Sequence, residues 1–590
     1  MLKMGNEFKP FILLTNSFAT YCVILQHRLK NFITILLIFI SLGTFAQDKY
    51  WVFFADKNGV EFNAAEYFHP KAIERRTKIN YPLDHYSDRP VVSQYVDQVS
   101  ALVDEVKMTS RWLNAAVVIA FPEQIKKIKQ LDFVIKTEFE PYDVALCLSN
   151  EKDSVDKEFE EQDLIRFQVE RMGGQFFDQA GYRGKGKTIA ILDAGFPGVD
   201  KSDLFKHIRE RDGIKGTYDF IRKTKNVYKR ISHGSTVLSC VGGILDDTVR
   251  IGMATDADFL LAITEKMMKE GSAEEEAWLA AAEWADKNGA DIINTSLGYT
   301  RRNYFKEEMD GKTAIISRAA NMASSKGILV IASAGNEGNK KNWIMVAAPA
   351  DGDSVLAIGA INPWSGLHTT FSSFGPSSDK DLKPNVTAIG HVIAYNDEKK
   401  MTETQGTSFS APLTAGFAAC AWEANPELTN WELLKRIEKS GDLYPYFDYA
   451  HGYGVPQSRH FIKDENVIPP LPDSIFYIEV EDDILQLSIR EDFMIKDTLE
   501  QGRDFNIYKF TDRINRHIYD RKKVKIDADH PFVKKEHFYY HVENDSVFLD
   551  EYSVLSVRDN PILTLNLDKM KGKTLRFHYR GYTQEMKIEE

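Results

Sequence analysis

Four short motifs in the middle of the 590-residue chain carry side chains of the types used in hydrolytic catalysis. The first contains Asp193, which follows the continuously apolar run Thr188–Leu192. Such a run predicts a strand buried on both faces, and open α/β sheets bind ligands at the carboxyl ends of these strands. The second contains His233, followed by Gly234 at the start of an apolar helical stretch. Taken singly, Asp193 also fits a turn and His233 a helix cap.

The other two motifs supply a side-chain amide and a hydroxyl. Asn336 lies in Ser-Ala-Gly-Asn-Glu-Gly, at the end of the apolar run Ile328–Ser333. An amide there can donate to a developing oxyanion, although an isolated Asn-Gly motif more often forms only a turn. Ser408 lies in Gly-Thr-Ser-Phe-Ser-Ala-Pro, before the small-residue helix predicted for Leu413–Ala424. The free N–H groups and dipole of a helix N-terminus favour negative charge nearby.

Together the motifs point to one kind of enzyme. They follow in the order Asp193, His233, Asn336, Ser408, at intervals of 40, 103 and 72 residues. Asp-His-Ser is the chain order of the subtilisin triad, and an Asn donates in the subtilisin oxyanion hole. On these motifs, residues 160–465 resemble the subtilisin-like serine peptidases, the S8 or subtilase family. The resemblance implies an α/β domain, with a parallel β-sheet flanked by helices, that acts as a serine endopeptidase.

The resemblance also implies a role for each residue. Ser408 would be the nucleophile, and His233 would take its proton and later pass it to the leaving amine. Asp193 would hold the imidazole in the required tautomer. Asn336 and the backbone N–H of Ser408 would form the oxyanion hole.

A substrate cleft is implied in the same way. The family segment that pairs with the substrate backbone matches Ser296, Leu297 and Gly298, although these residues also fit an ordinary turn at a strand end. The facing wall of the pocket for the residue before the scissile bond matches Ser333, Ala334 and Gly335. A substrate peptide would lie between the two segments as an added strand.

Three departures from the family pattern stand out. Ser235 replaces the usual Thr and Phe409 replaces a common Met, and both changes leave the chemistry intact. The segment Gly242–Thr255 lacks the Asn-rich loop of the tight calcium site found in many subtilases. Asp246 and Asp247 form a carboxylate pair there, but a solvated turn is the favoured interpretation. We therefore expect no metal site and no cofactor.

Apolar runs separated by helical segments predict the domain that positions these motifs, residues 158–466. The runs are short and continuously apolar, as in strands of a parallel sheet. One helix begins with a capping-box pattern at Ser272 and extends to about Asp286. The runs are Thr188–Leu192, Phe259–Thr264, Asp291–Thr295, Ile328–Ser333 and Val355–Ile361.

The preceding region, residues 48–157, has the order β-α-β-β-α-β of a ferredoxin-like fold. It resembles the inhibitory propeptides of subtilases. The polar, acidic stretch Asn150–Glu161 predicts an exposed linker, and we expect propeptide cleavage within residues 141–165. The predicted elements are Tyr50–Phe54, Val91–Val103, Glu105–Thr109, Trp112–Phe121, Pro122–Gln130 and Phe133–Thr137.

The two ends of the chain differ from the middle. Within residues 1–47, Arg28 and Lys30 precede the apolar stretch Phe32–Ala46, a secretory signal pattern. An uncleaved anchor is the alternative, but the stretch is shorter than the roughly 20 residues that span a bilayer. We expect a protein that is secreted or otherwise extracytoplasmic, which includes the periplasm and the cell surface. We expect no membrane span after cleavage of the signal. Residues 470–590, after a Pro-rich linker, alternate in short segments that predict a small all-β domain.

Cysteine content and composition narrow the class. Cleavage of the signal would remove Cys22 and leave Cys147, Cys240 and Cys420. The last two lie in apolar helical stretches, so buried thiols are favoured over a disulfide between them. With 43% hydrophobic and 27% charged residues, the chain is ordinarily globular, and its net charge of −12 disfavours a nucleic-acid binder.

The favoured function is a secreted serine endopeptidase made as a zymogen. Its partners would be peptide or protein substrates and its own N-terminal propeptide, an intramolecular inhibitor. One alternative is a catalytically inactive binding protein with a subtilase-like domain. The other is a cell-surface or secreted binding protein in which the C-terminal β domain carries the main function and the peptidase serves only maturation. Because all four catalytic positions hold suitable residues, the enzyme is favoured.

Overall fold

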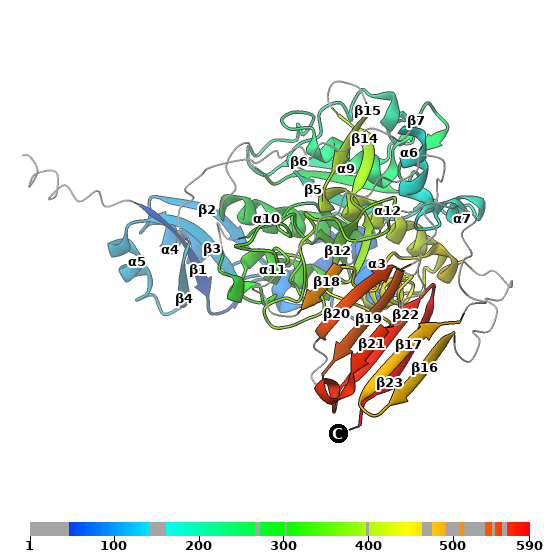
Figure 1. Ribbon diagram of the computed structural model, residues 1–590. Coiled ribbons are helices and arrows are strands. Elements are labelled where there is room, and N and C mark those ends of the chain that lie inside the picture. The colour runs from blue at the N-terminus through cyan, green and yellow to red at the C-terminus, as the bar shows by residue number, and fades with distance from the viewer. Residues whose placement is uncertain are drawn as a thin grey trace, which may run out of the picture. The chain divides into compact units, whose positions relative to one another are not determined.

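The computed structural model describes residues 47–140, 161–265, 272–300, 304–396, 401–462, 475–490, 508–511, 537–544, 549–556 and 563–589 (Figure 1). The predicted signal segment, Cys22, Cys147 and residues 150–160 of the predicted linker lie outside them. The chain forms two compact units. The first consists of Met1–Ala55, Ser93–Lys107 and Ala116–Glu140, and the second of Asp56–Val92, Met108–Ala115 and Pro141–Glu590. The four predicted domain boundaries remain a prediction.

A four-stranded sheet carries the ferredoxin-like order that the sequence predicts. Its strands lie in the order β2-β3-β1-β4, and β1 pairs antiparallel with β4. Every residue of β3 is buried, as expected for its all-apolar sequence. The strands are β1 (Asp48–Phe54), β2 (Glu105–Ser110), β3 (Ala115–Ala120) and β4 (Val134–Glu140), and the helices are α4 (Ser93–Ser100) and α5 (Pro122–Ile128).

Residues 56–92 contain helices that the sequence analysis did not predict. They are α2 (Ala64–Tyr67), α3 (Pro70–Lys78) and a 3₁₀ turn at Tyr86–Asp88. Pro70 occupies the first turn of α3, where its missing N–H is not needed. The buried residues of α3 include Arg75 and Arg76. Apolar periodicity therefore gave no sign of this helix.

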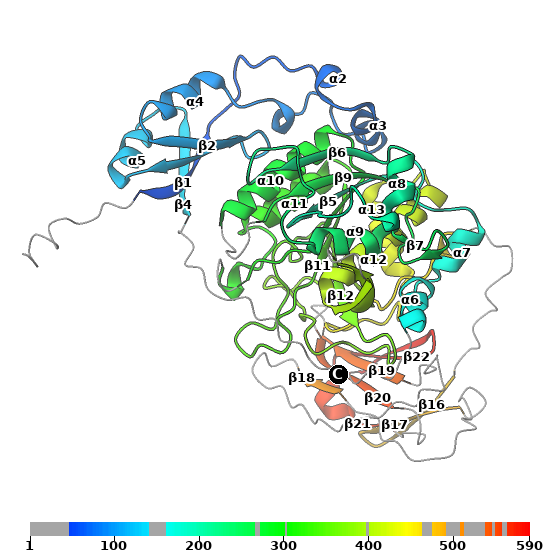
Figure 2. The same ribbon diagram turned by 90° about the horizontal axis from the view of Figure 1, so that it is seen from above.

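The second unit is built around a seven-stranded sheet in the order β13-β12-β11-β10-β5-β9-β6 (Figure 2). All neighbouring pairs are parallel. Five of the strands match the predicted apolar runs, while the edge strands β6 and β13 were not predicted. The strands are β5 (Thr188–Asp193), β6 (Ile214–Asp219), β9 (Asp258–Ile263), β10 (Ile292–Thr295), β11 (Leu329–Ser333), β12 (Val355–Ile361) and β13 (Val386–Ile389).

Helices flank this sheet, as predicted. The helix α12 packs on β10, β11, β12 and β13 and against α9, while α10 and α11 contact each other. Nearly all of α12 is buried, in keeping with its small and apolar residues. The helices are α6 (Glu161–Glu170), α7 (Gly174–Gln179), α8 (Lys206–Glu210), α9 (His233–Gly242), α10 (Ser272–Lys287), α11 (Ile315–Ser325), α12 (Thr407–Ala424) and α13 (Asn430–Lys439). No helix in the described part of the chain is long and apolar enough to cross a bilayer.

The two thiols of this sheet domain are free. Cys240 lies in α9 and Cys420 in α12, and both are buried. Burial raises the pKa of Cys240 to about 12, so this thiol stays protonated at neutral pH. The favoured interpretation of two buried thiols is confirmed.

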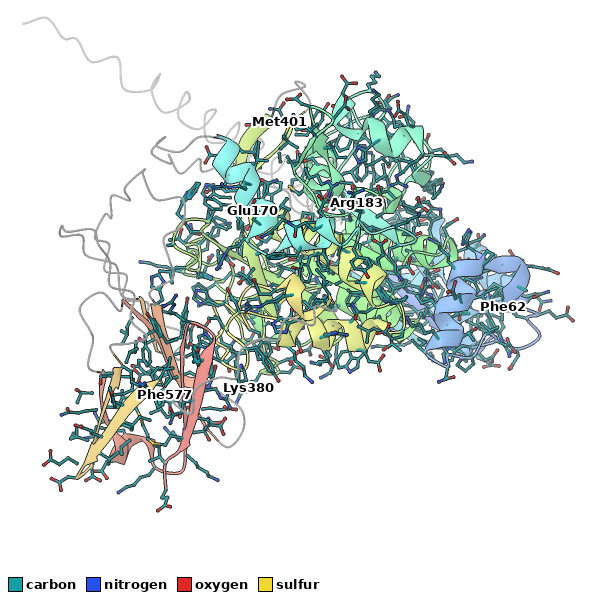
Figure 3. All side chains as sticks on the ribbon, turned by 90° about the vertical axis from the view of Figure 1, so that its right-hand side faces the viewer. Phe62, Glu170, Arg183, Lys380, Met401 and Phe577 are labelled. Atoms are coloured by element: carbon teal, nitrogen blue, oxygen red, sulfur yellow. The ribbon has the colours of Figure 1, made fainter. Side chains whose placement is uncertain are left out.

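The C-terminal region is all-β, as predicted. Two antiparallel sheets, β16-β17-β21 and β18-β20-β19-β22-β23, share an apolar core that includes Phe577 (Figure 3). Strands β20 and β23 lie outside the six strands predicted from the sequence, which are Ile475–Val480, Leu485–Ile489, Phe505–Phe510, Phe538–Val542, Ile562–Leu567 and Thr574–Tyr579. The strands are β16 (Phe476–Glu481), β17 (Ile484–Ile489), β18 (Tyr508–Thr511), β19 (His537–Glu543), β20 (Leu549–Ser556), β21 (Leu563–Asn566), β22 (Thr574–Tyr579) and β23 (Tyr582–Lys587).

The C-terminal β domain contacts the domain of the seven-stranded sheet through apolar and polar groups. Tyr446 and Leu443 cluster with Tyr539 of β19. The imidazole Nδ1 of His541 lies 2.6 Å from the carbonyl oxygen of Phe447. The two regions are therefore joined by a buried interface.

Candidate active site

A hydrogen bond joins Asp193 and His233 at the carboxyl end of β5. The Nδ1 atom of His233 lies 2.8 Å from Oδ1 of Asp193, and the same oxygen accepts the backbone N–H of Ala194 at 2.7 Å. Asp193 is completely buried, whereas the His233 side chain is 30% exposed. Because Asp193 accepts at Nδ1, the Nε2 atom of neutral His233 is left as a proton acceptor.

The glycine after His233 permits this close approach. A Cβ atom on Gly234 would lie 2.5 Å from the carbonyl oxygen of Gly195. Any side chain would push α9 away from the turn that follows β5, and the Asp193–His233 bond would lengthen.

The electrostatics of the pair favour a stronger base than free histidine. Burial lowers the pKa of His233, but the charge of Asp193 and the hydrogen bond to it together hold that pKa above its ordinary value of 6.5. A buried carboxylate stabilises the imidazolium more strongly than an exposed one would, because the local dielectric is low.

Ser408 lies in the first turn of α12. Its hydroxyl donates to the carbonyl oxygen of Ser296 at 3.1 Å, and the Ser296 hydroxyl donates to the carbonyl oxygen of Ser408 at 2.8 Å. The ring of the next residue, Phe409, lies with its centroid 5.7 Å from that of His233. A rotation about the Cα–Cβ bond would free the Ser408 hydroxyl from Ser296, and catalytic hydrogen bonds are often unformed without substrate.

The amide of Asn336 is held in a defined orientation. Its Oδ1 atom accepts from the backbone N–H of Thr407 at 3.0 Å and from the Thr407 hydroxyl at 2.9 Å. Its Nδ2 atom and the backbone nitrogen of Ser408 each lie 3.7 Å from the point where a Cβ atom on Gly406 would stand. The backbone φ of Gly406 is +149°. Both nitrogen atoms thus lie beside the space that a side chain at position 406 would fill.

The two predicted wall segments follow neighbouring strands. Ser296, Leu297 and Gly298 come after β10, while Ser333 ends β11 and is followed by Ala334 and Gly335. The methyl group of Ala347 lies 3.0 Å from a Cβ placed on Gly298 and 3.3 Å from one placed on Gly335. The two segments therefore stand on either side of Ala347, which the sequence analysis did not single out.

A second His-Gly pair, at His451, and the Asp246–Asp247 carboxylate pair both lie elsewhere. His451 is buried, with Nδ1 3.1 Å from Asp448 and Nε2 accepting the backbone N–H of His368 at 2.9 Å. Asp246 and Asp247 occupy the exposed turn between β7 (Ile244–Leu245) and β8 (Val249–Arg250). Among the described residues, no cluster of three or more His, Cys, Asp or Glu side chains could hold a metal ion.

The site also contains residues that sequence reasoning missed. Thr407 orients Asn336 through two hydrogen bonds. The signal for Thr407 was its place inside the Ser408 motif. Ala347 had no such signal, because it belongs to a segment without catalytic residue types.

Comparison with known proteins relates this arrangement to a family. The subtilase family, Peptidase S8, matches residues 184–454, and the Peptidase S8 propeptide domain of Bacteroidota matches residues 49–158. Subtilisin of Bacillus pumilus is 30% identical over 284 residues, which cover 47% of this chain and 90% of the relative. Subtilisin NAT of Bacillus subtilis subsp. natto is 26% identical over 368 residues, covering 61% of this chain and 83% of the relative.

A solved structure, MycP1 from Mycobacterium smegmatis, is 20% identical with a TM-score of 0.41, covering 58% of this chain and 93% of that one. The region matched by the subtilase family contains all four motifs. Since 90% of the Bacillus pumilus relative is covered at 30% identity, the chain belongs to the subtilase family of serine endopeptidases, with a subtilase propeptide domain before its peptidase domain.

Proposed function

We propose that Ser408, His233 and Asp193 form the catalytic triad of this endopeptidase, with Asn336 as the oxyanion donor. The observation that carries the proposal is the 2.8 Å contact between Nδ1 of His233 and the buried Asp193. It is supported by the position of Ser408 at the start of α12, one residue before a ring that contacts His233.

The reaction follows from these positions. The Ser408 hydroxyl oxygen attacks the substrate carbonyl carbon while its proton passes to Nε2 of His233. The resulting oxyanion accepts hydrogen bonds from Nδ2 of Asn336 and the N–H of Ser408. The imidazolium, stabilised by Asp193, then protonates the leaving amine, and the C–N bond breaks. A water molecule, deprotonated by His233, hydrolyses the acyl-enzyme ester and restores Ser408.

The substrate would lie in the cleft between the two wall segments. Ser296–Gly298 would offer backbone groups to an extended peptide, which would add to this segment as a strand. Ser333–Gly335 would form the facing wall, because the backbone N–H and C=O of Ala334 already bond to Ile358 and Ala347. The side chain before the scissile bond would point toward Ala347, which supports a pocket with a small residue at its floor.

We also propose that the protein is secreted as a zymogen. The signal pattern within residues 1–47 supports export, and the propeptide domain supports an inhibited precursor that is cut within residues 141–165. The buried interface between the peptidase domain and the C-terminal β domain supports a C-terminal domain that is an integral part of the enzyme rather than a separate binding module.

The pH dependence of kcat/KM tests the role of His233. Activity on a peptide substrate should fall as pH decreases through a pKa above 6.5, because protonated His233 cannot accept the Ser408 proton. Asp193→Asn should lower kcat by about 10⁴-fold. It should also move the midpoint of the profile to lower pH, because the charge that raises the pKa is gone. A flat profile between pH 5 and 9 contradicts the assignment of His233.

The oxyanion role of Asn336 predicts a loss confined to kcat. Asn336→Ala should lower kcat by about 10²- to 10³-fold with little change in KM, because the donor acts mainly in the transition state. Thr407→Val is the matched variant: it keeps the amide but removes one of the bonds that orient it. The kcat of Thr407→Val should lie between that of the wild type and that of Asn336→Ala. A normal kcat in Asn336→Ala would rule out Asn336 as the oxyanion donor.

Maturation tests the zymogen proposal. If the enzyme cuts its own linker, Ser408→Ala should accumulate with the N-terminal domain still covalently attached. Mass spectrometry of purified wild type and Ser408→Ala would report the N-terminus of each. Cleavage of the Ser408→Ala protein at the wild-type position, in a host without the wild-type enzyme, would assign maturation to another protease.

A further inference from the structure

We propose that residues 56–92 anchor the N-terminal region permanently to the peptidase domain, so that the mature enzyme consists of two chains held together without a covalent bond. We call this segment the anchor. It lies between β1 and α4 and contains α2 and α3 (Figure 2). It belongs to the same compact unit as the peptidase domain. The inference rests on the proposed function only in assuming that the linker is cut during maturation.

A buried arginine of the anchor holds two carboxylates. The guanidinium of Arg76 donates to both oxygens of Asp286, in α10, at 2.8 and 2.6 Å, and it lies 3.2 Å from Asp88 of the anchor itself. The side chains of Arg76 and Asp88 are 0% exposed and that of Asp286 is 1% exposed. Each of these buried charges therefore has a buried partner of opposite sign.

A second set of buried hydrogen bonds is donated by the peptidase domain to the anchor. Lys326, at the end of α11, is fully buried, and its ammonium group donates to three side chains of the anchor. These are Ser87 at 2.6 Å, Tyr81 at 2.8 Å and Asp88 at 2.9 Å. Arg75 of the anchor donates in turn to the carbonyl oxygen of Lys326 at 3.0 Å and also contacts Asp286.

These buried contacts should hold the anchor strongly on the peptidase domain. Removal of the anchor would leave Asp286 and Lys326 in the peptidase domain without their partners, and Arg75 and Arg76 in the anchor without theirs. Breaking a buried ion pair by loss of one partner is strongly destabilising, whereas exposed pairs contribute little. Salt does not screen the buried groups effectively, so high ionic strength should not release the anchor.

The peptidase surface is also shaped for the anchor. Gly289 follows α10 and Gly327 follows α11, with φ of +80° and +90°. A Cβ on Gly289 would lie 2.9 Å from Nδ1 of His69, and one on Gly327 would lie 2.8 Å from Cγ of Arg75. At the ends of both helices, the side chains of the anchor occupy space that a residue larger than glycine at position 289 or 327 would fill.

The anchor binds near the amino ends of the sheet strands, whereas the candidate active site lies at their carboxyl ends. Its Lys71 donates to Thr188, the first residue of β5, at 2.8 Å. Its Arg75 contacts the residues before β10 and β11, Ala290 and Lys326. Asp193, Ser296 and Ser333 stand at the other ends of the same three strands. The contacts of the anchor therefore lie toward the amino ends of these strands, away from the carboxyl ends that carry the proposed catalytic residues.

The test separates the covalent link from the anchor. A recognition sequence for a site-specific protease is inserted within residues 150–157 of the full-length Ser408→Ala protein, the linker is cut, and the product is analysed by gel filtration in 1 M NaCl at neutral pH. The two fragments should elute together at the mass of the uncut chain. Separation of a folded peptidase fragment from the N-terminal fragment would overturn the proposal.

Two variants assign the effect to the buried charges. Arg76→Ala should weaken the association of the cut fragments by about 10²- to 10³-fold, because Asp286 and Asp88 lose their shared partner. Arg89→Ala is the matched control, since Arg89 pairs with Asp84 in a solvent-exposed bridge inside the anchor. Its fragments should remain associated. Equal dissociation of both variants would contradict the role of the buried network.

The experiment stands even if Arg76→Ala does not fold. Hydrogen exchange of the cut Ser408→Ala protein should show α3 amides as protected as in the uncut chain, and rapid exchange there would refute permanent binding. Because Ser408→Ala has no nucleophile at position 408, co-elution does not depend on the triad. An inactive wild type with co-eluting fragments would refute the proposed function and leave the anchor in place.

Discussion

The candidate site depends on one constraint, that the buried carboxylate of Asp193 must receive hydrogen bonds where β5 ends. It receives them from Ala194 and from His233, and the second bond brings α9 against the sheet. Gly234 is required because no side chain fits between α9 and the turn after β5. The same contact directs Nδ1 of His233 to Asp193 and leaves Nε2 for a proton from the proposed nucleophile, Ser408.

At both ends of the central strands, a buried aspartate is paired with a basic side chain, but the two pairs differ in whether the base can change its charge. At the carboxyl edge, Asp193 is paired with a histidine that is partly exposed and can change its protonation state. At the amino edge, Asp286 is paired with the always-charged guanidinium of Arg76, out of contact with water. A titratable partner suits catalysis, whereas a permanent cation suits structural attachment.

Much of the peptidase domain could be predicted because its strands are buried on both faces and read as continuous apolar runs. The edge strand β6, with only one of its six residues buried, has no such run. The four proposed catalytic residues were found because their motifs and their order along the chain match one family. The helix α3 was missed because its buried face presents Arg75 and Arg76, whose shared partner Asp286 lies more than 200 residues away. Long-range charge pairing leaves no local periodicity, and Ala347 gave no chemical signal.

The most direct test of the central claim is the reaction of the processed protein with a fluorophosphonate probe, followed by peptide mass spectrometry. Such a probe labels a serine only when a base activates it and an oxyanion hole stabilises the adduct. The account predicts one adduct, on Ser408, in the wild type and none in His233→Ala. A folded, processed wild-type protein without an adduct, or with its adduct on another serine, would contradict it.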